Sequence, residues 1–394
     1  MTSQSLGRSA QAIPSDPGRC DVSIISSGAN FADARLHRLT NALLRAGLSV
    51  EIFAPGNPSD APHDISKKSV ESPQLVIHAT RGSLANGKNL ISRYHRSRIF
   101  CMRASGSILY AISPEAVVPA YFQAKLLRRK IAVDFYEDYL QVLHDRGWAK
   151  KFLGIPGFLA ALDTKAALWF SKRADLTTVA DAQVPPLSAR NRLIVRNLPD
   201  VSLLTDSGTP SELPRAIYIG DMRTSRGLRT MLEVATLVPQ WEFDLVGPIA
   251  VADQAFVDQW KLQNSDRIRA VRFHGKLTPR AAWKVAEGAW VGLSLLEKTP
   301  AFVEAVPSKL YEYMSVGLAI ISSPLPRCID LINTSGAGAI ASTPKEVAQQ
   351  LDLWEKDPVA LKDIKATARQ WAEVNLDSVT EYNNLATQFH QLLR

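Results

Sequence analysis

Two stretches of this sequence share one order of elements, and that order limits what the chain can fold into. Each begins with a short apolar run, passes through a glycine-containing loop into a helix, and ends in a second apolar run; the stretches cover residues 21–53 and 216–246. Strand, glycine loop, helix and strand in succession are typical of a parallel sheet covered by helices. The sequence therefore predicts an α/β protein with two doubly wound domains.

The domain boundaries follow from length and local composition. The 394 residues are enough for two domains with full cores. We predict a first domain over 20–200 and a second over 215–375, joined by a linker at 201–214 that is rich in turn-forming residues. Residues 1–19 combine Ser, Pro and Gly without an apolar core, which indicates a disordered tail and not a signal peptide. Residues 80–104 are basic and favour no particular element.

Charge and cysteine content narrow the function classes. The net charge of +8 fits an anionic substrate, a nucleic acid or an anionic membrane surface, or simply an indifferent basic surface. The three cysteines, Cys20, Cys101 and Cys328, are far apart, which argues against a disulfide framework or a zinc site and for a reducing, cytoplasmic compartment. No apolar run approaches 18 residues, so no transmembrane helix is expected.

Basic residues alternate with Trp and Phe over residues 146–173. Such a mixture can lie on an anionic membrane, and we expect peripheral attachment to the inner face of the plasma membrane on this basis. Core aromatics beside solvated lysines would give the same pattern. Nucleic-acid binding is not expected, because no nucleic-acid module accompanies the patch.

A predicted helix start near residue 307 contains candidate ligand-binding residues of the second domain. Glu304 and Glu312 stand eight positions apart, with Pro307 at a position that suits the first turn of a helix. Lys309 then falls in that first turn. A helix N-terminus suits an anionic phosphate, and nearby carboxylates could accept hydrogen bonds from sugar hydroxyls.

The loop at the start of the second domain is a further phosphate-binding candidate. A strand runs into a glycine- and arginine-rich segment that contains Gly220, Arg223 and Arg226 and continues into a helix. Arginine suits phosphate because its planar fork donates two hydrogen bonds at once. The plainer reading is that these are solvated arginines at a helix start.

The string Glu-x7-Glu, continued as Tyr-Met-x2-Gly-x-x-Ile to Ile320, resembles the donor-site signature of retaining glycosyltransferases of family 4. These enzymes, among them many that build bacterial cell-surface polysaccharides, have the GT-B fold: two Rossmann-like doubly wound domains that face each other across a cleft. The resemblance covers nearly all of residues 20–394. It implies that a C-terminal helix over 376–394 crosses back to the first domain.

The resemblance also assigns roles. It implies that Glu304 holds the donor sugar, that Glu312 holds the ribose, and that Arg226 and Lys309 stabilise the leaving diphosphate; Glu304, Arg226 and Lys309 are the catalytic candidates. Arg223 is expected to help them. The other donor-binding positions that it implies are Gly28, Gly220, Gly275, Lys276, Leu277, Pro307, Ser308 and Leu310.

The chain departs from the family pattern in three places. Ile112 and Tyr136 stand where histidines are common, and Asp221 stands where a basic residue is common. On the acceptor side this leaves Tyr136, Glu137 and Asp138 as candidates. The departures keep a second hypothesis open, namely a glycosyltransferase-like binding protein that has lost catalysis.

The function that the sequence predicts is transfer of a sugar from a nucleotide-sugar to a hydroxyl of a glycan or polyprenyl-linked acceptor, with retention of anomeric configuration. The nucleotide-sugar is a co-substrate, and no cofactor is expected. No metal is expected either, because no Asp-x-Asp string follows a strand and the cations named above would take its place.

Overall fold

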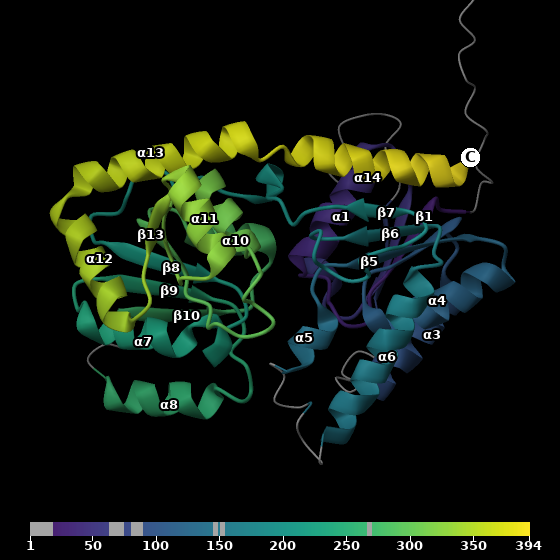
Figure 1. Ribbon diagram of the computed structural model, residues 1–394, viewed down its shortest axis with the longest axis horizontal. Helices are drawn as coiled ribbons and strands as arrows, with labels where there is room; N and C mark the ends of the chain where they lie inside the picture. The colour runs from purple at the N-terminus through teal and green to yellow at the C-terminus, as the bar shows by residue number, and fades with distance from the viewer. Residues whose placement is uncertain (1–18, 63–74, 80–89, 145–148, 150–153, 266–269) are drawn as a thin grey trace, which may run out of the picture.

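Two parallel sheets, each covered by helices, make up the protein (Figure 1). The computed structural model describes residues 19–62, 75–79, 90–144, 149, 154–265 and 270–394. Of the tail expected at 1–19, residues 1–18 lie outside the described residues. The first sheet has the strand order β3-β2-β1-β4-β5-β6-β7 and the second β10-β9-β8-β11-β12-β13, with parallel pairing throughout. The predicted α/β architecture is confirmed.

The first domain is formed by the chain from β1 to β7. Its strands are β1 (Val22–Ile25), β2 (Val50–Ala54), β3 (Leu75–Ala79), β4 (Ile108–Ala111), β5 (Lys130–Phe135), β6 (Leu176–Val179) and β7 (Arg192–Ile194). Its helices are α1 (Ala34–Arg45), α3 (Leu90–Arg103), α4 (Pro114–Leu126), α5 (Tyr139–His144) and α6 (Ile155–Ser171), with the 3₁₀ turn η1 at Pro58–Asp60. Most central-strand residues are buried, as expected for a parallel sheet with both faces covered. Helix α3 lies within residues 80–104, for which the sequence favoured no particular element.

The second domain repeats this plan. Its strands are β8 (Arg215–Ile219), β9 (Glu242–Val246), β10 (Val271–Gly275), β11 (Val291–Ser294), β12 (Ala319–Ser322) and β13 (Gly338–Ile340). Its helices are α7 (Leu228–Leu237), α8 (Gln254–Gln263), α9 (Pro279–Val285), α10 (Ser308–Ser315), α11 (Pro326–Ser335), α12 (Pro344–Lys356) and α13 (Pro358–Asn375). The 3₁₀ turn η5 (Thr224–Arg226) precedes α7, and η4 (Val201–Leu203) lies in the linker.

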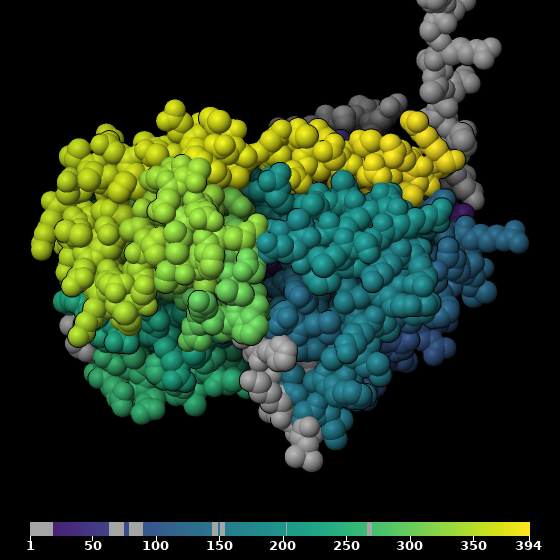
Figure 2. Space-filling view, viewed as in Figure 1, coloured from purple at the N-terminus to yellow at the C-terminus, as the bar shows by residue number. Residues whose placement is uncertain are grey.

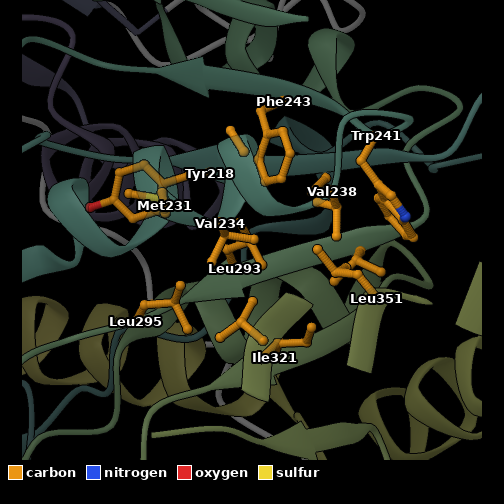
Figure 3. Close-up of a cluster of buried hydrophobic side chains, with 14 of the residues drawn as sticks. Tyr218, Met231, Val234, Val238, Trp241, Phe243, Leu293, Leu295, Ile321 and Leu351 are labelled. Carbon is orange, nitrogen blue, oxygen red and sulfur yellow. The ribbon is translucent and has the colours of Figure 1, made fainter. Parts of the chain in front are cut away.

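One apolar core of the second domain packs α7 and α12 onto the sheet (Figure 3). Tyr218, Trp241 and Phe243 are among its largest fully buried side chains. Fully burying a large side chain contributes about 1.5–3 kcal/mol, so this layer holds the sheet whose loops build the site.

The last helix, α14 (Ser378–Leu393), returns to the first domain after α13 has crossed the second (Figure 1). It packs against α1, and Phe389 inserts into the core with its ring edge-on to Tyr110 at a centroid distance of 5.0 Å. The hydroxyl of Tyr382 donates to the carbonyl of Leu198 at 2.9 Å. The C-terminus is therefore part of the first domain's core.

We expect Phe389→Ala to lower the free energy of unfolding of the first domain by about 3–5 kcal/mol, because it leaves a ring-sized cavity in a closed core. Val379→Ala, on the exposed side of the same helix, is the matched control and should change little. Urea denaturation followed by fluorescence measures both. Equal midpoints for the two variants would mean that α14 is only loosely attached.

Candidate functional site

A cavity of about 650 Å³ lies between the domains, along the seam visible in Figure 2. The first domain lines it with the segments that follow β5, β6 and β7, and the second with the segments that follow β8 and β11 and with the start of α11. Ligands of doubly wound sheets bind at the carboxyl ends of strands, where such loops converge. The charged residues in its lining are Glu137, Asp138, Asp181, Arg196, Arg226, Glu304, Lys309 and Arg327.

Lys309 is buried in the first turn of α10, at the wall of this cavity. Its Nζ stands 5.1 Å from the centre of the Tyr218 ring. Gly220 makes room for it: its φ is +149°, and a Cβ at this position would lie 2.9 Å from Nζ. Burial, and then the charge of Arg226, lowers the pKa of Lys309 to about 8. The fold therefore holds a cation where its surroundings oppose the charge.

Arg226, at the end of η5, faces the same cavity. Its Nη2 lies 3.6 Å from Oε1 of Glu137, which belongs to the first domain. Its Nε is buried and has no hydrogen-bond partner among the described residues. A buried donor left without an acceptor is costly and calls for an explanation. An anionic ligand oxygen would supply the missing acceptor.

Arg223 has an acidic partner in its own loop, although its buried Nε, like that of Arg226, has no hydrogen-bond partner among the described residues. Its Nη2 donates to Oδ2 of Asp221 at 2.8 Å, so the acid at the departing position neutralises part of its charge. Neither Arg223 nor Asp221 is in the cavity lining. Arg223 thus offers a ligand less free charge than the sequence suggested.

The N-terminus of α10 opens on the cavity. Pro307, Ser308 and Lys309 line it, and the first turn contains no acidic residue. The free N–H groups and positive dipole end of this turn add to the attraction for an anion. Leu310 does not reach the cavity; it is fully buried in the core and anchors the helix.

The two glutamates occupy different environments. Glu304 is exposed in the turn ahead of α10 and lines the cavity, while its carbonyl accepts a hydrogen bond from Arg327 Nη1 at 2.9 Å. Glu312 is buried and forms an ion pair with Arg38, on α1 of the first domain. Glu304 is therefore free to contact a ligand, whereas the carboxylate of Glu312 already has a partner.

The remaining donor-binding candidates lie away from the cavity. Gly28 is exposed beside the ion pair of Arg93 and Glu115, and is not in the lining. Gly275, Lys276 and Leu277, at and after the end of β10, are not in the lining either. Lys276 Nζ instead donates to Oδ1 of Asn30 at 2.5 Å, across the domain interface.

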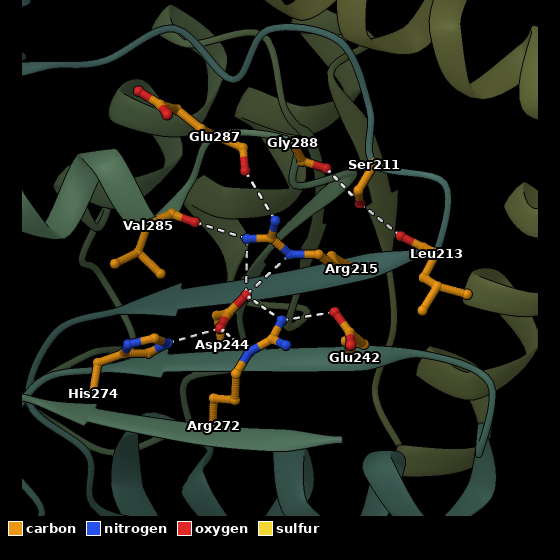
Figure 4. A network of polar contacts seen from close by, with 10 residues as sticks. All are labelled: Ser211, Leu213, Arg215, Glu242, Asp244, Arg272, His274, Val285, Glu287 and Gly288. Atoms are coloured by element: carbon orange, nitrogen blue, oxygen red, sulfur yellow. Dashed lines mark hydrogen bonds and ion pairs between the residues drawn. The ribbon is translucent and has the colours of Figure 1, made fainter. Parts of the chain in front are cut away.

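A polar network beneath the β10 loop explains the histidine next to it (Figure 4). Nε2 of His274 contacts Oδ1 of Asp244 at 2.7 Å, and Asp244 also pairs with Arg215 and Arg272. Burial opposes the charge of Asp244, but hydrogen bonds from Arg272 and His274 outweigh it and keep the pKa of the carboxyl below its usual value. His274 is therefore a structural residue that fixes the start of this loop.

The three residues expected on the acceptor side, Tyr136, Glu137 and Asp138, follow β5 and all line the cavity. Oδ1 of Asp138 also accepts from the backbone N–H of Leu140 at 3.1 Å and so caps α5. Ile112 points into the apolar core instead, where a histidine would be buried among hydrocarbon side chains.

Sequence reasoning missed the residues that join the domains across the site. Arg38 reaches Glu312, and Arg327 Nη2 bonds Oδ2 of Asp181 at 2.9 Å; Arg196 also lines the cavity. No local pattern marks them, because their partners lie 146 or 274 positions away in the chain. Among the described residues, no group of His, Cys, Asp and Glu could hold a metal ion.

Comparisons with known proteins support the fold. Residues 204–371, less than half of the chain, match the family model "Glycosyl transferases group 1". No curated protein matches the chain. Among solved structures, Anabaena HepE in complex with UDP and glucose is similar, with TM-score 0.65 and 14% identity over 94% of this chain and 100% of that one.

Two further structures have the same arrangement. Sucrose-phosphate synthase from Thermosynechococcus elongatus has TM-score 0.65 and 14% identity, covering 95% of this chain and 99% of its own. A glycosyltransferase from Rickettsia africae has TM-score 0.57 and 12% identity, covering 96% and 99%. The fold is GT-B, as the sequence predicted, and the second domain matches the group 1 glycosyl transferase model.

The lowered pKa of Lys309 leads to a prediction about stability. An unfolded chain binds a proton on this lysine up to its ordinary pKa of 10.5, whereas the folded protein releases it near 8, so the charged lysine costs stability below that pH. Lys309→Met should therefore raise the free energy of unfolding, on the order of 1–3 kcal/mol near neutral pH.

This gain should shrink as the pH rises from 8 towards 10.5, because the wild type loses its buried charge there. Chemical denaturation at several pH values measures it, with Lys362→Met, at an exposed position, as the control. A loss of stability at all pH values would show that Lys309 is a structural cation.

Proposed function

We propose that the protein is a glycosyltransferase that moves a sugar from a nucleotide-sugar to an acceptor hydroxyl, with retention at the anomeric carbon. The observation that carries this proposal is the convergence of Lys309, Arg226 with its unsatisfied Nε, and the α10 N-terminus on one interdomain cavity. A diphosphate fits this arrangement because it is negatively charged, has acceptor oxygens and is of a size that suits the cavity.

The proposed chemistry is mainly electrostatic. The bond between the anomeric carbon and the diphosphate oxygen breaks, and the acceptor oxygen bonds to the same carbon. Negative charge grows on the leaving phosphate, where Arg226, Lys309 and the helix N-terminus stabilise it. The acceptor proton passes to that phosphate, so no protein base is required. We propose metal independence because these groups supply the positive charge.

The two glutamates have separate proposed roles. Glu304, exposed at the cavity, would accept hydrogen bonds from the donor sugar hydroxyls. Glu312 would hold the ribose, and its ion pair with Arg38 links nucleoside binding to contact between the domains. UDP is the first nucleotide to test, because HepE was crystallised with UDP and with UDP-glucose. The acceptor is proposed to be a glycan or a polyprenyl-linked glycan on the cytoplasmic side.

We expect Arg226→Ala and Lys309→Ala each to weaken UDP binding by about 1.5–3 kcal/mol, since each removes a charged hydrogen-bond donor from the diphosphate. Isothermal titration calorimetry measures the affinity. Lys365→Met is the matched control: Lys365 is also buried with its pKa lowered to about 8, yet it donates to the carbonyl of Ala289 and does not line the cavity. Affinities equal to wild type for both site variants would place the diphosphate elsewhere.

We expect Glu304→Gln to impair turnover and Glu312→Gln to impair nucleotide binding. Glu304→Gln removes charge but keeps shape, so turnover should fall far more than UDP affinity, as for an interaction used in the transition state. Glu312→Gln should weaken UDP binding itself. Hydrolysis or transfer from UDP-sugars, measured beside UDP titrations, separates the two.

The same assays test the binding-protein alternative, which Ile112, Tyr136 and Asp221 favour. Donor binding by the wild type without hydrolysis or transfer to any glycan or polyprenyl-linked acceptor would support it. Ile112 and Tyr136 would then be the first positions to change to histidine.

A further inference from the structure

Helix α6 is amphipathic in the opposite sense to an ordinary surface helix. The residues that it buries fully against the first domain are small, namely Ala160, Thr164, Ala167 and Ser171, and Leu168 and Phe170 are partly buried beside them. Its large apolar residues point outward: Phe158 is 69% exposed and Leu162 57% exposed. A helix that packs only on its own domain turns its large apolar side chains inward. The outer side of α6 is therefore built to be covered by something else.

This apolar side is one continuous stripe. Ile155, Phe158, Leu159, Leu162 and Trp169 are all exposed and fall at i, i+3, i+4, i+7 and i+14. At 3.6 residues per turn these positions lie on one side of the helix. The stripe runs the length of α6.

The neighbouring helix α4 continues the surface. The two helices pack side by side, and Phe122 of α4 lies edge-on to Phe170 of α6 at a centroid distance of 5.3 Å (Figure 1). Phe122 and Leu126 are exposed beside the stripe. We call these seven residues the α4–α6 face: Phe122, Leu126, Ile155, Phe158, Leu159, Leu162 and Trp169.

The exposed charges on and directly after these two helices have one sign. The exposed ionisable residues of α4, α6 and the residues directly after each helix are basic: Lys125, Arg128, Lys130, Lys165, Lys172 and Arg173. The acidic residues of α4 and α6 are Glu115, which is buried and paired with Arg93, and the half-buried Asp163. The guanidinium of Arg173 stacks on the Trp169 ring, with Cζ 3.6 Å from the ring centre.

We propose that the α4–α6 face docks on an anionic lipid bilayer. Exposed aliphatic and aromatic side chains enter the headgroup region, and the surrounding lysines and arginines meet anionic headgroups. Trp169, with the Arg173 guanidinium stacked on its ring, suits this interface because a tryptophan side chain has an apolar ring and a polar N–H. No helix among the described residues is long and apolar enough to span a membrane. The part of 146–173 that the sequence suggested beyond α6, residues 146–148 and 150–153, lies outside the described residues.

Vesicle flotation with the full-length protein tests the proposal. The wild type should float with phosphatidylglycerol-containing vesicles, float less at higher salt because screening weakens the attraction, and bind pure phosphatidylcholine weakly. Phe158→Asp/Leu162→Asp should reduce binding at least about tenfold. Lys165→Glu/Lys172→Glu should reduce it by about fivefold per cation removed.

Matched controls make the same changes on the second domain. Leu262→Asp/Val374→Asp alters two exposed apolar residues, and Lys356→Glu/Lys362→Glu two exposed lysines; both should float like the wild type. Thermal unfolding confirms that each variant is folded. The proposal does not rest on the donor site, so UDP affinity should be unchanged in all four variants.

Three results would overturn the proposal. One is a wild type that ignores anionic vesicles at low salt. Another is equal flotation of Phe158→Asp/Leu162→Asp and its matched control. The third is a dimer seen by analytical ultracentrifugation that this variant dissociates, without vesicle binding, which would assign the face to a second copy of the chain.

Discussion

The position of Lys309 is the constraint on which the site depends. An ammonium group buried near Arg226 raises the energy of the folded protein, so the helix that carries it must be held firmly. Tyr313, one turn further along α10, provides this hold. Its hydroxyl accepts from the N–H of Ile219 at 3.2 Å, and its ring fills the space left by Gly292, where a Cβ would lie 2.5 Å from the ring. Packing of α10 onto β8 and β11 thus keeps the ammonium group of Lys309 at the cavity, although its burial costs stability.

The contacts between the domains are of two physical kinds. On one side of the molecule α14 is bound to the first domain by apolar packing, with Phe389 fully buried. Across the cleft the contacts are polar: Arg38 with Glu312, Glu137 with Arg226, and Asp181 with Arg327. The pair of Arg38 and Glu312 is buried, so separating its partners would cost stability. The pairs of Glu137 with Arg226 and of Asp181 with Arg327 are partly exposed and contribute little net stability, so a charged ligand can replace them. The contacts that line the cavity can therefore rearrange while α14 stays packed on the first domain.

The sequence predicted the elements better than their contacts. Buried strands, glycine turns and the Pro307 helix start are local signals, so both domains and the exposed, cavity-facing position of Glu304 were predictable. Helix α3 was missed because its apolar residues are interrupted by arginines. Gly28 and Lys276 were expected at the donor site but lie outside the described cavity. Whether a loop residue reaches a cleft depends on how two domains face each other, and no spacing within one domain reports that.

Helix α6 shows that sequence alone also does not decide which side of a helix is buried. Its sequence contains small residues on one side and large apolar ones on the opposite side, and either could have been buried. Close packing against α4 requires small residues, which leaves the large ones outside. Helix α6 is also connected to the cavity. The cavity-lining residues Tyr136, Glu137 and Asp138 lead directly into α5, and α5 packs against α6. A bilayer bound at the α4–α6 face would therefore lie on the domain whose Tyr136, Glu137 and Asp138 line one wall of the cavity.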